Sequence, residues 1–194
     1  MSDEETWRRF EAIALPHLDA AYNLARWLTR NDHDAEDVVQ EALVRAMRYL
    51  DGFRGEGARP WLLQIVRNTC WSWLKANRPA ENVALGDDDG SDAAGHELAA
   101  PAGDEPPAIA MRKADRVLID QAIAALPPAF REVLVLRELE DLSYAEIARI
   151  VEIPIGTVMS RLARARALMR GALAPTARPL LRTVPRIAQN GGAS

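Results

Sequence analysis

The feature that most constrains the fold is an acidic stretch between residues 79 and 110. It carries eight acidic residues, no lysine or arginine, and no aromatic residue. A segment of this composition cannot bury enough apolar surface to offset the entropy lost on ordering its backbone. We therefore predict a flexible acidic linker over 79–110, which divides the chain into one domain at 1–78, another at 111–172, and a basic, flexible tail at 173–194.

Both halves outside this linker show the spacing of amphipathic helices. Apolar residues recur at intervals of three and four, and no segment alternates as a strand does. We predict an all-α fold of two small helical domains. The expected helices cover 6–15, 17–30, 34–50, 61–77, 108–126, 130–139, 143–152 and 154–170, and Asp34 is expected to cap the third of them.

The stretch 142–170 is typical of two helices joined by a tight turn. Ser143 and Glu146 have the spacing of a capping box, and Pro154 suits the first turn of the second helix. The polar side of that second helix carries hydroxyls and arginines that suit base edges and phosphates, namely Thr157, Ser160, Arg161 and Arg164. Helix pairs of this kind also occur in many proteins that bind no DNA.

The charge distribution favours the DNA-binding interpretation of this helix pair. From residue 153 onward the chain has seven arginines and no acidic residue, which is what phosphate contact requires. The net charge of −4 does not argue against it, because residues 111–194 alone carry a net charge of +5.

A second candidate surface lies on the expected helix over 61–77. Its polar side combines aromatic, amide, hydroxyl and cationic residues, namely Trp61, Gln64, Asn68, Trp71, Ser72 and Lys75, with Arg67 adjacent. Such a surface either packs against neighbouring helices or contacts unstacked bases, since an aromatic ring stacks on any base. The residues alone leave both interpretations open.

Composition excludes several other classes of protein. The single cysteine, Cys70, excludes a disulfide framework and a cysteine-based zinc site, and it suits a reducing cytosol. No apolar run is long enough to span a membrane, and the polar N-terminal segment is unlike a signal peptide, so we expect a cytoplasmic protein. The three histidines lack metal-ligand spacing, and there is no phosphate loop or nucleophile motif. We therefore expect no cofactor, no metal and no enzymatic activity.

Three motifs together resemble one protein family. DAEDVVQEALVRAM, FRGEGARPWLLQIVRNTCWSWLKAN and LPPAFREVLVLRELEDLSYAEIARIVEIPIGTVMSRLARAR occur in this order, with the acidic linker before the last of them. They resemble regions 2.2, 2.3–2.4 and 4 of sigma factors of the extracytoplasmic-function type in the sigma-70 family. The resemblance implies a non-catalytic subunit of RNA polymerase that binds the core enzyme and promoter DNA, helps to open the duplex, and is held inactive by an anti-sigma factor.

The resemblance also implies roles for particular residues. Asp34, Asp37, Gln40 and Glu41 match the surface that binds the clamp helices of the polymerase β′ subunit; the β subunit is a further implied partner. The loop from Phe53 to Arg59 matches the one that captures a flipped base of the −10 element, and Trp61, Gln64, Arg67, Asn68 and Trp71 belong to the −10 surface. Thr157, Ser160, Arg161 and Arg164 match the helix that reads the −35 element.

Two positions depart from the family pattern. Glu152 stands in the turn between the two helices where the family often has glycine, and glutamate takes a positive φ less readily. Met159 stands where the family often has lysine or arginine, so one DNA contact is expected to be missing. The tail beyond Arg170 is also uncommon in the family.

Two other functions are compatible with parts of the sequence. A free-standing helix-turn-helix regulator that binds as a dimer would explain 142–170 but would leave the surfaces on 34–48 and 61–75 without a role. A sigma-like decoy would bind an anti-sigma protein and no DNA. The arginines of the expected recognition helix, which a decoy would lack, are present.

Overall fold

The computed structural model describes residues 3–55, 57–78 and 107–174, and every element in these ranges is helical. This confirms the all-α prediction. The predicted tail lies almost wholly outside the described residues, as does nearly all of the predicted linker. The first domain contains α1 Asp3–Ala14, α2 Leu18–Thr29, α3 Asp32–Tyr49 and α4 Ala58–Asn77, with the short turns η1 Leu15–His17 and η2 Leu50–Gly52. The second contains α5 Pro107–Ala125, α6 Pro128–Leu134, α7 Tyr144–Val151 and α8 Ile155–Leu173, with the π-helical η4 Val135–Leu139 extending α6.

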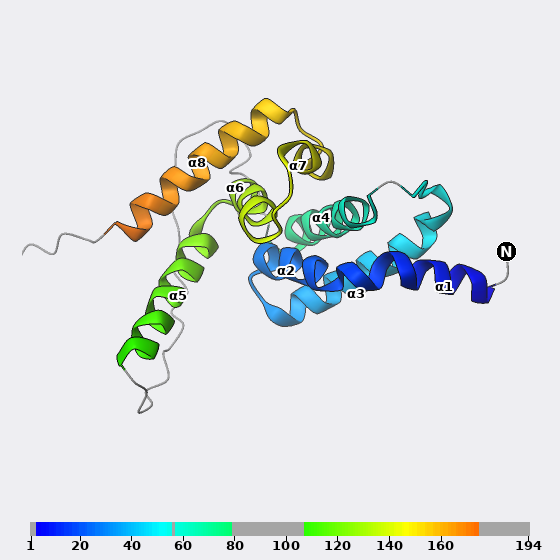
Figure 1. Cartoon of the computed structure of the whole chain (residues 1–194), viewed down its shortest axis with the longest axis horizontal. Helices are drawn as coiled ribbons and strands as arrows, with labels where there is room; N and C mark the ends of the chain where they lie inside the picture. Colours follow the sequence, from blue (N-terminus) through cyan, green and yellow to red (C-terminus); the bar gives the residue numbers. More distant parts are fainter. Residues whose placement is uncertain (1–2, 56, 79–106, 175–194) are drawn as a thin grey trace, which may run out of the picture.

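The first domain is built by the mutual packing of α2, α3 and α4 (Figure 1). The inner face of α4 differs slightly from the face that periodicity predicts. Helical periodicity predicts an inner face formed by Leu62, Ile65, Val66, Thr69 and Trp73. In the structure Leu63 and Cys70 are also fully buried, whereas Ile65 and Trp73 are only half-buried. The reason is that α4 packs on two sides, against α2 and α3 on one and against α7 of the second domain on the other.

The start of α3 corrects one prediction. Asn31, rather than Asp34, is the N-cap: its backbone is extended, and its side-chain oxygen accepts a hydrogen bond from the Asp34 N–H at 3.0 Å. Asp34 therefore lies inside the first turn, where its carboxylate faces the positive end of the helix dipole. Both residues have the chemistry of a cap, and only the path of the chain after α2 decides between them.

The second domain contains the predicted capping box and helix pair. Ser143 caps α7, with its hydroxyl accepting from the Glu146 N–H and the Glu146 carboxylate accepting from the Ser143 N–H. At the turn, Glu152 adopts the left-handed conformation, with φ of 57°. A glutamate in this region costs roughly 1–2 kcal/mol relative to a relaxed backbone. The turn therefore takes the left-handed conformation that a glycine at this position would adopt without strain.

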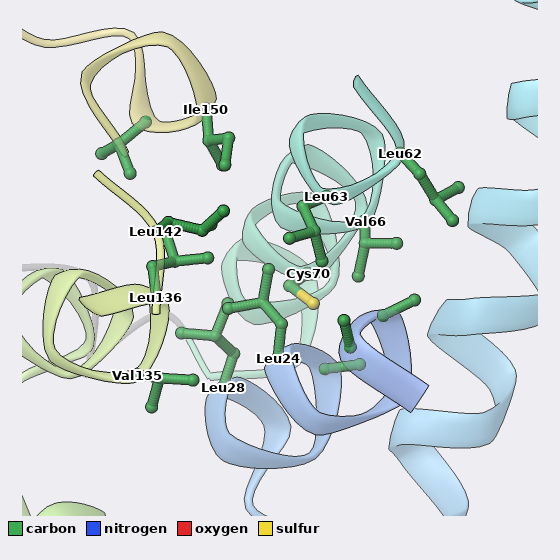
Figure 2. Close-up of a cluster of buried hydrophobic side chains, with 14 of the residues drawn as sticks. Leu24, Leu28, Leu62, Leu63, Val66, Cys70, Val135, Leu136, Leu142 and Ile150 are labelled. Carbon is green, nitrogen blue, oxygen red and sulfur yellow. The ribbon is translucent and has the colours of Figure 1, made fainter. Parts of the chain in front are cut away.

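The two domains are packed against each other, a feature that helical periodicity gave no means of predicting. Leu24 and Leu28 of α2 and Leu63 of α4 belong to the same buried cluster as Leu136 and Ile150 of the second domain. Figure 2 shows these side chains converging between α2, α4, η4 and α7. The two hydrophobic cores are therefore continuous across the boundary between the domains.

Candidate nucleic-acid interface

The candidate polymerase-binding residues lie on α3. Asp37, Gln40 and Glu41 are exposed, and Asp34 is half-buried at the start of the helix. The Glu41 carboxylate accepts a hydrogen bond from Arg45 at 2.8 Å, which holds it along the helix surface. Because α3 packs on α2 and α4 with its other side, these polar groups form an open, largely acidic face.

The loop after α3 does not present its aromatic ring to solvent. Phe53 is buried, and its ring packs on that of Trp61 with centroids 4.9 Å apart. Arg9 of α1 donates a hydrogen bond to the Phe53 carbonyl at 2.9 Å, which fixes the loop against the first helix. In this conformation the Phe53 ring supports the loop from its buried side. A flipped base would therefore contact other atoms of the loop.

The polar face of α4 is turned toward the second domain. Gln64 donates to Glu152 at 3.0 Å, and Arg67 donates through Nε to Glu132 at 3.0 Å. The Trp71 indole N–H donates to the same Glu132 oxygen at 2.6 Å. Asn68 is exposed, although its side-chain oxygen accepts from Arg67, and Ser72 and Lys75 further along the helix are exposed as well.

Arg59, at the start of α4, makes a similar contact. It forms a hydrogen-bonded ion pair with Glu140, whose carboxylate is 5% exposed. Asn23 of α2 donates to the other oxygen of Glu140 at 3.2 Å. The entry to α4 is therefore also fastened to the second domain by a buried acid.

The recognition helix α8 is only partly covered. Ser160 and Arg164 are exposed, and Thr157 is half-buried. Met159, at the position where the sigma factors that the sequence resembles often have lysine or arginine, is also exposed. Arg161 turns toward the interior, and its guanidinium lies 3.5 Å from Glu132. The structure thus brings one candidate DNA-reading residue of α8 into contact with the same acid that pairs with Arg67 of α4.

Glu132 and its neighbour Arg131 are the important residues that the sequence analysis missed. The Glu132 side chain is fully buried and accepts from donors on two helices that both carry candidate DNA-reading residues. Burial raises the pKa of the Glu132 carboxyl, and the adjacent Arg67 guanidinium opposes that rise. The available signal was a pair of charged residues inside an apolar run, which indicates buried partners but does not identify them.

The structure gives no sign of a metal or membrane-spanning element in the parts it describes. Among residues 3–55, 57–78 and 107–174, no group of three or more His, Cys, Asp or Glu side chains is placed to hold a metal ion. No helix in those same ranges is long and apolar enough to cross a membrane. Cys70 of α4 is buried, and that burial raises the pKa of its thiol.

Comparison with known proteins finds two families that match the two domains in chain order. Residues 13–79 match Sigma-70 region 2, and residues 116–169 match Sigma-70, region 4. The chain is 35% identical over 158 residues to the ECF RNA polymerase sigma-E factor of Haemophilus influenzae, covering 78% of this chain and 80% of the relative. It is 34% identical over 174 residues to the RNA polymerase sigma-H factor of Pseudomonas aeruginosa, covering 88% of this chain and 89% of that one.

A solved structure shares the overall arrangement. The sigma factor RpoE from Bartonella quintana, co-crystallised with the anti-sigma factor NepR, is 27% identical and superposes with a TM-score of 0.63. The superposition covers 84% of this chain and 96% of that one. This coverage requires both helical domains to contribute to the similarity.

Proposed function

The chain belongs to the extracytoplasmic-function (ECF) RNA polymerase sigma factors of the sigma-70 family, and from this we propose that it binds core RNA polymerase and directs it to the promoters of a particular set of genes. It acts as an initiation factor that recognises two promoter elements and helps to open the duplex. The observation that carries the proposal is the family's order of domains, with a polar −10 helix in the first and a basic helix-turn-helix in the second. Because polymerase and chromosome share the cytoplasm, we infer that the protein acts there.

Core binding is assigned to the open face of α3. Asp37, Gln40 and Glu41 offer hydrogen-bond acceptors and negative charge to the β′ clamp helices, and Asp34 extends this face to the helix start. A partly exposed polar helix face outside the hydrophobic stripe supports this assignment, because it can be covered by a partner without unfolding the domain.

Promoter reading is divided between α4 and α8. On α4 we assign Arg59, Trp61, Gln64, Arg67, Asn68 and Trp71 to the −10 element, with Phe53 supporting the preceding loop. On α8 we assign Thr157, Ser160, Arg161 and Arg164 to the −35 element. The capped α7 leads through the turn at Glu152 directly into α8, which is the order of a helix-turn-helix and supports the docking of α8 in a major groove.

Control by an anti-sigma factor is supported by an open apolar groove on the second domain. The groove has a volume of about 590 Å³, and its apolar lining includes Ile119, Ile123, Leu134, Leu139, Met169 and Leu173. The side chains of Leu139 and Leu173 are 48% and 41% exposed, so this apolar surface is in contact with solvent unless a partner covers it. The structurally similar RpoE was crystallised with its anti-sigma factor, which gives the class of partner.

Reconstitution with core polymerase tests the proposed function. Core enzyme and this protein, mixed with genomic DNA from the native host, should give transcripts whose mapped 5′ ends share two upstream elements. Core enzyme alone should not give these start sites. If the mixture produced no start sites beyond those of core alone, the proposal would be wrong.

The anti-sigma assignment needs its own comparison. A partner that co-purifies with the protein should inhibit the reconstituted reaction, and Leu139→Glu in the groove should release it. Leu168→Glu changes a similarly exposed leucine of α8 that does not line the groove, so it serves as the matched control. Equal binding to both variants would remove the groove from the model of regulation.

A further inference from the structure

The contacts between the two domains fall on the residues assigned to DNA. Arg59, Gln64, Arg67 and Trp71 all donate hydrogen bonds to glutamates of the second domain. The accepting carboxylates belong to Glu132, Glu140 and Glu152.

The chemistry of these contacts resembles that of nucleic-acid recognition. Phosphate oxygens and base edges accept hydrogen bonds from arginine, amide and indole donors, as carboxylate oxygens do here. Arg67 also stacks on Trp71, with its guanidinium carbon 5.4 Å from the ring centroid, so the ring and the cation are engaged together. The three glutamates therefore occupy donors that single-stranded −10 DNA would need.

We propose that the second domain is an intramolecular inhibitor of the first, in which Glu132, Glu140 and Glu152 take the place of −10 DNA on α4. This rests on the proposed function. The −10 strand and the second domain compete for one surface, and promoter binding requires the domains to separate. Arg161 pairs with Glu132 in the same closed arrangement, so separation also frees one residue of the −35 helix.

The interface is built to be reversible. The apolar cluster in Figure 2, with Leu136, Leu142 and Ile150 against Leu24 and Leu63, supplies the non-directional attraction. Buried ion pairs add little net stability, because the desolvation of both charges offsets their attraction. On opening, the Glu132 carboxylate regains water while Arg67 and Arg161 gain phosphates, so DNA replaces what the closed form loses.

A reversible cross-link tests the proposal. Asn23 and Glu140 lie on opposite sides of the interface, 3.2 Å apart at their side-chain tips, and Asn23 has no assigned role in DNA binding. In an Asn23→Cys, Glu140→Cys variant, the shorter cysteine side chains leave room beside the exposed position 23, so that a short bifunctional methanethiosulfonate reagent should join the domains. Cys70 is fully buried and keeps all of its neighbours, so it should stay unreactive. The joined protein should bind a −10 single strand, taken from the mapped promoters, at least tenfold more weakly. Dithiothreitol should restore binding.

Two controls make the result specific. The Asn23→Cys single variant, treated with the same reagent, should bind DNA as the untreated protein does. If the joined double variant bound the −10 strand as tightly as its reduced form, the proposal would be overturned. That result is distinct from failure of the sigma function, in which the reduced and wild-type proteins would support no promoter-specific start sites at all.

A second pair of variants opens the interface instead of closing it. Glu140→Gln removes a charge that pairs with Arg59, and it should tighten binding of the −10 strand by roughly three- to tenfold, the effect of one charge-assisted hydrogen bond. Asp141→Asn makes the same change in charge at the next residue, whose side chain is 96% exposed and pairs with Arg137 of its own domain. Equal tightening by both variants would mean that bulk charge, rather than the interface, controls binding, and would contradict the proposal.

Discussion

Arg67 of α4 and Glu132 of α6 form an ion pair across the boundary between the two domains, with Nε and Oε2 3.0 Å apart. The same carboxylate accepts from Trp71 and pairs with Arg161, so one buried acid touches residues assigned to both promoter elements. A sigma factor reads these elements on one DNA molecule with two domains. Under the proposed assignments, the two domains must therefore separate before α4 and α8 can both reach DNA.

DNA binding by the proposed recognition helix α8 should depend most strongly on its exposed Arg164. Arg164→Ala is expected to reduce promoter-dependent transcription by about tenfold and to lower the salt dependence of DNA binding by about one counterion. Arg161→Ala should weaken transcription less, because losing the contact with Glu132 also eases opening. Run-off transcription at several salt concentrations measures both. Arg149→Ala on α7 is the control, and unchanged initiation in both α8 variants would contradict the assignment.

Charge reversal on α3 should weaken assembly with the core enzyme. Asp37→Lys and Glu41→Lys each place a cation where we assign contact with the β′ clamp helices, and the Kd for core polymerase should rise by about tenfold. Fluorescence anisotropy with labelled protein gives the affinity. Glu11→Lys, an equal change in charge on the exposed side of α1, should leave it unaltered. An unaltered Kd in the two α3 variants would remove this surface from the model.

Phe53 should matter first for stability. Because its ring is buried against Trp61, Phe53→Ala is expected to lower the free energy of unfolding of the first domain by about 3–5 kcal/mol. Phe53→Leu keeps most of the volume and should cost roughly 1.5 kcal/mol or less. Urea denaturation followed by tryptophan fluorescence compares the two. An alanine variant of full stability that binds the −10 strand poorly would instead favour direct contact between this ring and a base.

The capping box of α7 should make the stability of the second domain depend on pH. Hydrogen bonds from the Ser143 side chain and backbone lower the pKa of Glu146 below its usual value. The carboxylate therefore stabilises the folded form above about pH 4.5, and this contribution disappears as the pH falls through the lowered folded value. Glu146→Gln should be less stable than the wild type by up to about 1 kcal/mol at pH 7, since the cap is mostly exposed.

Urea unfolding of the full chain at pH 7 and at pH 3 checks the sign of this effect. The difference between the wild type and Glu146→Gln should be smaller at pH 3, which lies below the ordinary pKa of a glutamate carboxyl, than at pH 7. Asp141→Asn, which removes an exposed acid outside the capping box, is the matched control for the loss of one carboxylate. A gap that stayed constant between the two pH values would mean that the carboxylate charge contributes nothing to the cap.

Local signals in the sequence predicted most of the fold. The helix periods, the Ser143–Glu146 box and the helix-turn-helix depend on residues close together along the chain, and the structure contains them. The predicted N-cap of α3, Asp34, was wrong because Asn31 has similar capping chemistry and lies three residues earlier. The roles of the site residues stay predictions, and their surroundings could not be predicted, because Arg67 and Glu132 are 65 positions apart and meet only through the packing of two domains.

The Arg131 guanidinium donates to the carbonyls of Trp27 and Leu28 at the end of α2 and to those of Ala124 and Leu126 at the end of α5. One planar cation is therefore a shared terminal cap for two helices on opposite sides of the boundary. If one domain slid along the other, the α2 carbonyls would lose Arg131 without gaining water, which leaves buried acceptors unsatisfied. Full separation would instead expose both α2 carbonyls to water in one step. In the proposed separation of the domains, this shared cap favours an all-or-none transition, in which the protein is either closed or open and intermediate arrangements are rarely populated.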